Sequence, residues 1–287
     1  MAERLADIAA KITNVRQLEA VVTAMRGIAA SRAQQGRALL GGIEAYSDVV
    51  TRSMGEALAL LPEGESMQPV SGRQRRGLIL FSAEQGFVGT FGERILDAAG
   101  ESLKDAAVFI LGTRGAAIAA ERGVDLAWSA PMATQAGAVI ATANRVADAL
   151  YASVAEGRMT DVDILFPSFV PASGLKITRR SLLPLDLTRF RRPITNLPPL
   201  TTLAPPDLIE NLAAEYVFAQ LCNAAMHAFA AENEARMLAM AAAKTNVQTK
   251  LEELSRRERQ LRQEEITTEI IELAAGAEAM DQARRRL

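Results

Sequence analysis

The distribution of proline constrains the fold of this 287-residue chain more than any other feature. All 11 prolines lie between Pro62 and Pro206, and the sequence on either side of that stretch has none. An interior proline removes a helical hydrogen bond and clashes with the preceding turn, so a long proline-free flank can form a single helix. The sequence therefore predicts three parts: an N-terminal coiled-coil helix over 1–61, a central domain over 62–206 and a C-terminal coiled-coil helix over 207–287.

The N-terminal flank carries apolar residues at steps of three or four. This spacing is close to the 3.5-residue period of a coiled coil. A helix of this length would extend for roughly 90 Å at 1.5 Å per residue. The predicted seam comprises Leu5, Ile8, Ile12, Val15, Leu18, Val22, Met25 and Ala29.

The C-terminal flank carries two apolar stripes, the second offset by one position from the first, and Asp207 is its expected N-cap. Such an offset indicates a register shift. A helix this long cannot bury its face inside a compact domain, so we expect the two chain ends to pair antiparallel. The resulting rod keeps apolar surface that only a sleeve of other subunits would cover. The stripes are Val247, Leu251, Leu254 and Leu261, then Ile266, Ile270, Leu273, Ala277 and Met280.

The central part alternates short apolar runs with amphipathic segments. This alternation predicts a small, largely parallel, Rossmann-like α/β sheet covered by helices. A fifth run, 175–185, is expected to add an edge strand. The expected strands are 77–82, 106–112, 124–130 and 162–170, and the expected helices are 91–103, 114–122 and 134–156.

Three glycines follow the first expected strand and resemble a phosphate-binding loop. Their order, Gly86-Phe-Val-Gly89-Thr-Phe-Gly92, differs from the G-x-G-x-x-G of dinucleotide folds, and Phe87 occupies part of the space that a pyrophosphate needs. No P-loop lysine follows. We interpret the segment as a structural turn between strand and helix, with a nucleotide-binding α/β enzyme as the alternative function.

Composition argues against most catalytic chemistry. Cys222 and His227 are the only cysteine and histidine, so the chain can form neither an internal disulfide nor a Cys/His metal site. Both lie in the expected C-terminal helix. We expect Cys222 to be a small buried hydrophobe, and His227 to be a packed or solvent-facing side chain and not a general base. The sequence thus predicts no catalytic, cofactor-binding or metal residues.

Charge and hydropathy narrow the possible partners. The net charge of −2 and the lack of aromatics in the basic clusters disfavour nucleic acid. The first residues include acids, so they form neither a signal peptide nor a membrane span, and we expect a chain that is soluble or peripheral to a membrane. The run 255–265 mixes charges of both signs. It fits a solvated face with intrahelical pairs or a polar collar gripped by a partner.

The ends of the sequence resemble one family closely. "AENEARMLAMAAAKTN…LRQEEITTEIIELAAGAEAM" is similar to the C-terminal signature of the gamma subunit of F-type ATP synthases, and "KITNVRQLEAVVTAMRGIAASR" to its N-terminal segment. "FSAEQGFVGTFG" and "ILGTRGAAIAAERG" lie where that family has S-D-R-G-L-C-G-G-x-N and a G-x-K-G segment. The resemblance covers essentially the whole chain in order, with a more diverged middle.

This resemblance implies a non-catalytic rotor. In the family, the terminal helices form a shaft inside a hexamer of alternating alpha and beta subunits, and the α/β domain, with the epsilon subunit, sits on the membrane ring of c subunits. The shaft couples ion flow through the ring to ATP synthesis or hydrolysis. A peripheral position on the cytoplasmic face of the bacterial inner membrane is therefore expected, and a stand-alone coiled-coil scaffold remains the other alternative.

The resemblance also implies which residues contact the beta subunits. Met25 and Arg26 match a Met-Lys pair that faces the lever segment of a beta subunit. Arg262 and Gln263 match the Arg-Gln pair that engages a beta-subunit catch loop. Neighbouring polar positions of the same helix are Thr267, Glu269 and Glu272.

The sequence departs from the family pattern in three places. Gly92 replaces the family's Asn, "SAEQ" replaces S-D-R, and three arginines, 284–286, lie where the shaft tip usually meets an apolar bearing. This divergence is similar to that of the alternative N-type F-ATPases that some bacteria carry beside their main synthase.

Overall fold

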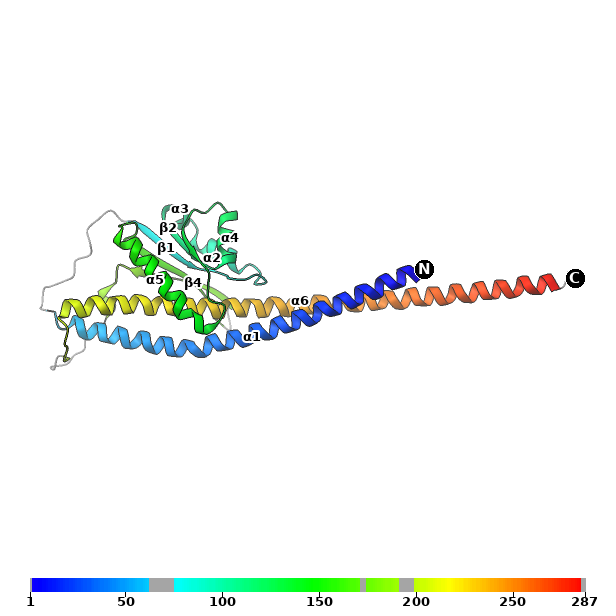
Figure 1. Cartoon of the computed structure of the whole chain (residues 1–287), viewed down its shortest axis with the longest axis horizontal. Helices are drawn as coiled ribbons and strands as arrows, with labels where there is room; N and C mark the ends of the chain where they lie inside the picture. Colours follow the sequence, from blue (N-terminus) through cyan, green and yellow to red (C-terminus); the bar gives the residue numbers. More distant parts are fainter. Residues whose placement is uncertain (1, 62–74, 171–173, 191–198, 285–287) are drawn as a thin grey trace. The chain divides into compact units, whose positions relative to one another are not determined.

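The computed structural model describes residues 2–61, 75–170, 174–190 and 199–284 (Figure 1). Its contacts divide the chain into two compact units: Met1–Gly27 with Leu238–Leu287, here the terminal helix pair, and Ile28–Met237, here the sheet domain. The three-part division by residue number stays a prediction. The elements are α1 (Ala2–Leu58), β1 (Arg76–Phe81), α2 (Phe91–Ala99), α3 (Ser102–Asp105), β2 (Ala107–Leu111), α4 (Thr113–Glu121), β3 (Leu126–Ala130), α5 (Val139–Ala155), β4 (Asp161–Val170), β5 (Gly174–Leu183) and α6 (Pro205–Arg284).

The sheet domain is built on a five-stranded sheet in the order β3-β2-β1-β4-β5. The first four strands are parallel, and β5 pairs antiparallel with β4 as the added edge strand. Ile79 in the central strand lies between Phe109 of β2 and Ile164 of β4. Both the predicted strands and the predicted α/β class are confirmed.

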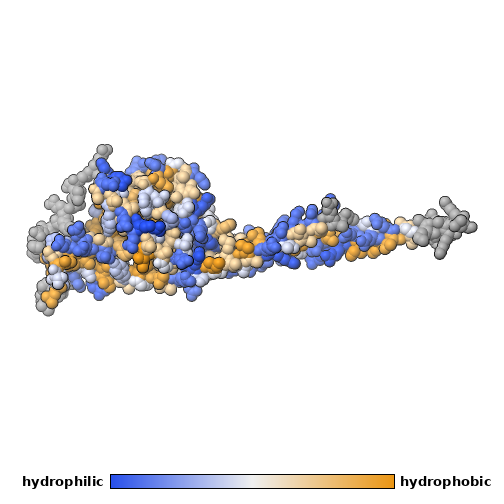
Figure 2. Space-filling model, viewed as in Figure 1, coloured by the Kyte–Doolittle hydropathy of each residue, from blue (hydrophilic) through white to orange (hydrophobic). Residues whose placement is uncertain are grey.

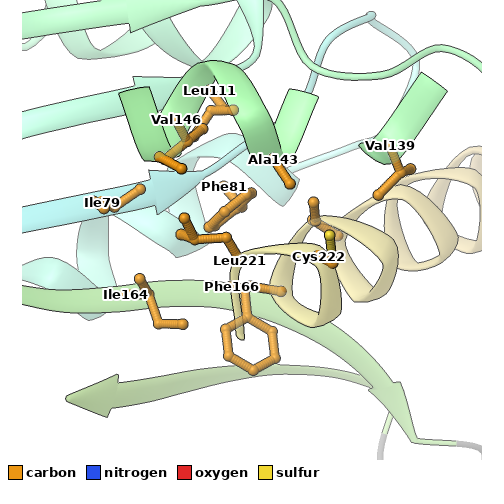
Figure 3. Close-up of a cluster of buried hydrophobic side chains, with 14 of the residues drawn as sticks. Ile79, Phe81, Leu111, Val139, Ala143, Val146, Ile164, Phe166, Leu221 and Cys222 are labelled. Atoms are coloured by element: carbon orange, nitrogen blue, oxygen red, sulfur yellow. The ribbon is translucent and has the colours of Figure 1, made fainter. Parts of the chain in front are cut away.

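Alternating side chains of β1 build two cores, one on each face of the sheet. Leu78 and Leu80 join the helices α2 and α4 on one face, through residues such as Ile95. Ile79 and Phe81 join α5 and α6 on the other face. Figure 3 shows the labelled members of this second cluster, in which α5 and α6 approach the sheet: Ile79, Phe81, Leu111, Val139, Ala143, Val146, Ile164, Phe166, Leu221 and Cys222.

The helices α1 and α6 approach each other closely inside the sheet domain. A Cβ at Gly36 would lie 3.1 Å from Ala230 Cβ and 3.1 Å from Phe229 Cδ1. Contacts this short require a neighbour to move, so glycine at 36 permits the approach. Helix α6 itself begins at Pro205, which places Asp207 in the first turn; the expectation of Asp207 as the N-cap is wrong. The aspartate still lies where the helix dipole favours an anion.

The terminal helix pair has a narrow seam. A hydrogen bond of 3.0 Å from Gln248 Nε2 to Glu19 Oε1 joins the two helices and sets their antiparallel register. The buried apolar residues among the described positions of the pair are Ile12, Val22, Met240, Val247, Leu254 and Leu261. Figure 2 shows hydrophilic and hydrophobic residues alternating along the visible surface of these helices.

One predicted seam position is wrong. Leu18 is half exposed, while Glu19, one residue further on, is partly buried. A heptad seam that contains Ile12 and Val15 takes a step of four to residue 19, so the acid occupies the seam position. Its methylene groups cover the seam while its carboxylate accepts the bond from Gln248.

The second apolar stripe of α6 does not continue the seam. Ile266, Ile270 and Leu273 have exposed fractions of 50%, 61% and 75%. The register set by Glu19 and Gln248 brings Ala2, the first residue of α1, level with Glu265, so α6 continues beyond its partner helix. Met280 lies outside the residues whose side chains the structure describes.

Candidate functional site

The first pair of predicted contact residues lies on α1 in the terminal helix pair. Met25 is partly buried and Arg26 is exposed. The Met25 side chain thus lies at the edge of the seam, and the guanidinium of Arg26 lies in water. A partner reaching this face would therefore meet a thioether beside a full positive charge.

The second group lies on α6. Arg262 Nη2 donates a hydrogen bond of 3.0 Å to Glu258 Oε1 one turn earlier, and the arginine side chain is 62% exposed. Thr267 Oγ1 donates to the carbonyl of Gln263 at 2.8 Å, which uses its hydroxyl within the helix. An exposed ion pair of this kind contributes about 0–1 kcal/mol, so Arg262 can exchange Glu258 for another acid at little cost.

The structure does not bring the two groups together. In the register set by Glu19 and Gln248, residue 26 lies level with the start of the α6 part of the pair, whereas Arg262 lies level with the first turns of α1. About 20 residues of helix separate the two levels, which corresponds to about 30 Å along the helices. Glu269 and Glu272 are exposed beyond Arg262 on the unpaired end of α6. Met25 and Arg262 thus belong to two separate contact levels.

The surface around the second group is polar and open. A shallow depression there is lined by side chains of α6 that offer amides, hydroxyls and charges and no enclosed apolar wall. Such a surface suits a protein contact and not a small-molecule pocket. Its lining residues are Arg257, Gln260, Gln263, Glu264, Thr267 and Thr268.

The glycine loop between β1 and α2 has an unusual backbone. Phe87 adopts φ = 62° and Gly89 φ = 60°, both in the left-handed region that side chains other than Gly, Asn and Asp rarely enter. The Phe87 ring is 68% exposed, so burial of the ring does not offset the cost of this backbone conformation. Contacts elsewhere must hold this loop in place.

Glu232 of α6 supplies those contacts. Its Oε2 accepts a hydrogen bond of 3.1 Å from the backbone N–H of Glu84, and its Oε1 accepts one of 3.2 Å from Gln85. Parallel sheets of this class bind anions outside the carboxyl ends of strands where the chain switches faces, here between β1 and β4. The chain's own carboxylate therefore occupies backbone donors that a bound phosphate would need.

A second carboxylate fills the neighbouring anion position. Glu84 accepts hydrogen bonds from Thr113 N at 3.0 Å, Thr113 Oγ1 at 2.9 Å and Met132 N at 2.7 Å, so it caps the start of α4. A Cβ at Gly115 would come within 2.3 Å of Ser82 Oγ, so the space behind the loop is closed as well. This geometry disfavours the alternative of a nucleotide-binding enzyme.

Cys222 is buried, as expected, and His227 is partly buried. Burial raises the pKa of the Cys222 thiol to about 11, so the thiol is a poor nucleophile at neutral pH. His227 stacks on Phe166 with ring centroids 5.7 Å apart, and burial lowers its pKa. Within the residues that the structure describes, no three His, Cys, Asp or Glu side chains converge as a metal site.

The sequence as a whole matches a known family. Residues 4–280 fit the family described as ATP synthase. The chain belongs to the ATP synthase family. A protein of Frankia casuarinae named "ATP synthase gamma chain" is 26% identical, with 98% of this chain and 99% of that protein aligned. The Streptomyces griseus protein of the same name is also 26% identical, with 95% of each aligned.

Solved members of the ATP synthase family share the fold. The mitochondrial ATP synthase of Euglena gracilis contains a chain with a TM-score of 0.69 and 12% identity, with 99% of this chain and 97% of that chain aligned; the structure comprises "OSCP/F1/c-ring". A rotor chain from the same organism gives a TM-score of 0.66 at 12% identity, with 93% of this chain covered. The predicted combination of an α/β domain with two long terminal helices is confirmed.

Sequence reasoning missed the residues that hold the glycine loop. Glu84, Glu232 and Arg236 were quoted only as letters of the ATP synthase motifs. A signal for two of them was present. Glu232 and Arg236 interrupt an alanine-rich stretch of α6 at a spacing of four, which predicts a buried pair, because charged residues are almost never buried unpaired.

Proposed function

We propose that this chain is the gamma subunit and central-stalk rotor of an F-type ATP synthase. The observation that carries the proposal is the end of α6, where isoleucines and leucine are exposed beyond the partner helix. Contiguous apolar surface of this kind marks a protein interface, and a helix inside a ring of subunits would cover it. The names of the relatives and the titles of the solved rotors support the same conclusion.

The proposed partners follow from the family. Alpha and beta subunits surround the terminal helix pair, and the epsilon subunit and the c-ring contact the sheet domain. Among the described residues, no helix is both long and apolar enough to cross a bilayer. We place the assembled chain on the cytoplasmic face of a bacterial inner membrane, held there by the other subunits.

The proposed mechanism is conformational coupling without chemistry in this chain. The two contact levels carry different side chains: Met25 and Arg26 on one, Arg262 and Gln263 on the other, with Thr267, Glu269 and Glu272 beyond. Because α6 continues alone beyond the end of α1, the shaft is not symmetric about its long axis. Its sides therefore present different surfaces. Three identical beta subunits around it would make unequal contacts, and such differences in contact free energy hold them in different states.

The test removes the side chains of Arg262 and Gln263 together in a reconstituted complex of alpha, beta and gamma subunits. A charge-assisted hydrogen bond contributes about 1.5–3 kcal/mol, so we expect coupled ATP turnover to fall by about tenfold or more if the bond forms in the rate-limiting state. The matched control is Arg16→Ala with Gln17→Ala, the same residue types at adjacent exposed positions of α1, outside both contact groups.

Two results would contradict the proposal. The first is unchanged ATP turnover in the Arg262→Ala, Gln263→Ala complex, with the control pair also unchanged. The second is a stable homodimer of the chain that does not associate with alpha and beta subunits, which would favour the stand-alone scaffold instead.

A further inference from the structure

The proposal concerns Glu232 and Arg236 of α6. We propose that this pair is a rotational lock, whose two positioning residues hold α6 in one setting about its axis against the glycine loop, so that torque passes between α6 and the sheet. The contacts of the lock do not depend on what the chain does, whereas its role in passing torque rests on the proposed function.

Arg236 completes the contact that Glu232 begins. Its Nη2 donates to Glu232 Oε1 at 2.6 Å, its Nε to the carbonyl of Gly86 at 3.3 Å and its Nη2 to the carbonyl of Gln85 at 3.4 Å. The loop therefore donates two N–H groups to the acid and offers two carbonyls to the base. Both side chains are almost fully buried, with exposed fractions of 5% for Glu232 and 7% for Arg236.

The pair is held on its other side as well. Arg236 Nη1 donates to Asn233 Oδ1 at 3.2 Å, and Asn233 Nδ2 donates to the carbonyl of Phe229 at 2.8 Å. Glu234, the next acid along α6, forms an ion pair with Arg37 of α1. The polar contacts thus fix this turn of α6 from two directions, toward the loop and toward α1.

Stability alone is a weak reason for such a pair. Burying two charges costs desolvation energy, and apolar side chains of similar size often stabilise a core equally well. Three of the four α6 residues that precede Glu232 are small, Ala228, Ala230 and Ala231, and the fourth is the buried Phe229. Alanine contacts are not directional and resist rotation of a helix poorly, whereas the fork of an arginine and a two-pronged carboxylate have fixed geometry.

A rotation of α6 by one residue position would break all of these contacts together. Successive residues point about 100° apart around a helix, so a shift by one position would turn Glu232 away from the N–H groups of Glu84 and Gln85. The buried donors would then lack partners, which is costly. The lock therefore has one setting.

The experiment compares three variants in the full chain and in the reconstituted membrane complex. Glu232→Gln keeps the shape but presents an amide to the loop, and Arg236→Lys keeps the charge but loses the fork. Glu210→Gln, at an exposed acid on the same helix, is the control. Hydrogen exchange at the amides of Glu84 and Gln85 measures the contact, and ATP hydrolysis and ion-driven ATP synthesis measure torque.

A lock predicts that the variants lose ion-driven ATP synthesis but keep ATP hydrolysis. We expect amide exchange to accelerate about tenfold or more in Glu232→Gln and Arg236→Lys. Ion-driven synthesis should fall severalfold, while hydrolysis by the detached alpha–beta–gamma complex stays within about twofold of wild type, because that reaction does not pass torque to the sheet domain. Glu210→Gln should match wild type in every measurement.

A further variant tests whether the carboxylate that binds the loop must be part of α6. In Glu232→Ala, sodium acetate should restore protection of the Glu84 and Gln85 amides by occupying the same donors, with sodium chloride as the control. Synthesis should remain low, because acetate is not tethered to α6. Recovery of synthesis with acetate would overturn the lock.

Other outcomes would overturn the lock or the proposed function separately. Unchanged amide exchange in both lock variants, or an equal loss of hydrolysis and synthesis, would overturn the proposal and assign the pair a structural role. If the wild-type chain fails to associate with alpha and beta subunits, the proposed function fails, and the exchange measurement still judges the contact by itself.

Discussion

The sheet domain and the terminal helix pair hold themselves together in different ways. The sheet domain buries whole aromatic side chains, among them Phe81, Phe166 and Phe229, between layers. The helix pair buries single aliphatic residues about two turns apart, such as Val247, Leu254 and Leu261, with exposed residues between them. One unit carries a layered core, and the other buries only a seam.

Charged pairs also differ between the two units, because one is buried in the sheet domain and the other lies at the surface of the terminal helix pair. Glu232 and Arg236 are buried and satisfied by fixed backbone groups, so they specify one geometry. Arg262 and Glu258 form the same kind of i, i+4 pair at the surface, where the arginine is exposed and the pair is weak and exchangeable. Position decides whether an identical pair fixes a conformation or remains available to a partner.

The largest expected effect tests the core of the sheet domain. Phe81→Ala should lower the free energy of unfolding by about 3–5 kcal/mol, because it removes a fully buried ring and leaves a cavity. Urea unfolding of the full chain measures the change. Phe87→Ala, at an exposed ring, is the control and should change stability by less than about 0.5 kcal/mol. Similar losses at both positions would contradict the assigned core.

A smaller effect is expected in the terminal helix pair. Leu254→Ala should cost about 1–2 kcal/mol, below the usual range for a buried leucine, because water can reach a two-helix seam. Hydrogen exchange should locate the loss in residues 2–27 and in the facing part of α6, with the sheet domain unaffected. An equal rise in exchange across the sheet would show that the two units unfold together.

A third change should affect assembly without affecting the chain alone. Ile270→Asp replaces an exposed residue, so the free energy of unfolding should stay within about 0.5 kcal/mol of wild type. Binding to alpha and beta subunits should weaken by about tenfold or more, because a charge would enter an apolar contact. Titration of labelled chain measures the affinity. Unchanged affinity would mean that this face stays in water within the complex.

The smallest effect is a dependence on pH. Burial lowers the pKa of His227, so the unfolded chain takes up the proton first as pH falls. Its contribution to stability is complete above the ordinary histidine pKa of about 6.5 and is lost as pH falls through that value toward the folded pKa. Wild type should therefore lose slightly more stability than His227→Gln between about pH 7 and about pH 5. The opposite order would mean that the folded state favours the charged ring.

Local sequence patterns predicted the elements of this fold well. Runs such as 162–170 and the proline-free flanks carry signals of strand and helix that their neighbours alone determine, and β4 and α6 formed there. The seam was harder to predict. Leu18 is the more apolar residue, yet heptad geometry selects Glu19, because period and not hydropathy decides which positions face the partner helix.

Contacts between residues far apart in the chain could not be predicted from the sequence. Glu232 and Glu84 are separated by 148 positions, and their hydrogen bond depends on how α6 crosses the ends of the strands. The glycine spacing disfavoured a nucleotide, but it did not reveal that the carboxylate of Glu232 accepts the backbone N–H groups of Glu84 and Gln85. The contact roles of Arg262 and Gln263 stay predictions, since they depend on other subunits.

The buried thiol of Cys222 makes the chain convenient for site-specific labelling. It is the only cysteine, and burial raises its pKa to about 11, so maleimide dyes should react with it slowly at neutral pH. Gly41 lies on an exposed turn of α1 with nothing within 4 Å of an added Cβ. A cysteine placed there would accept a fluorophore or a bead while the natural sequence stays otherwise intact.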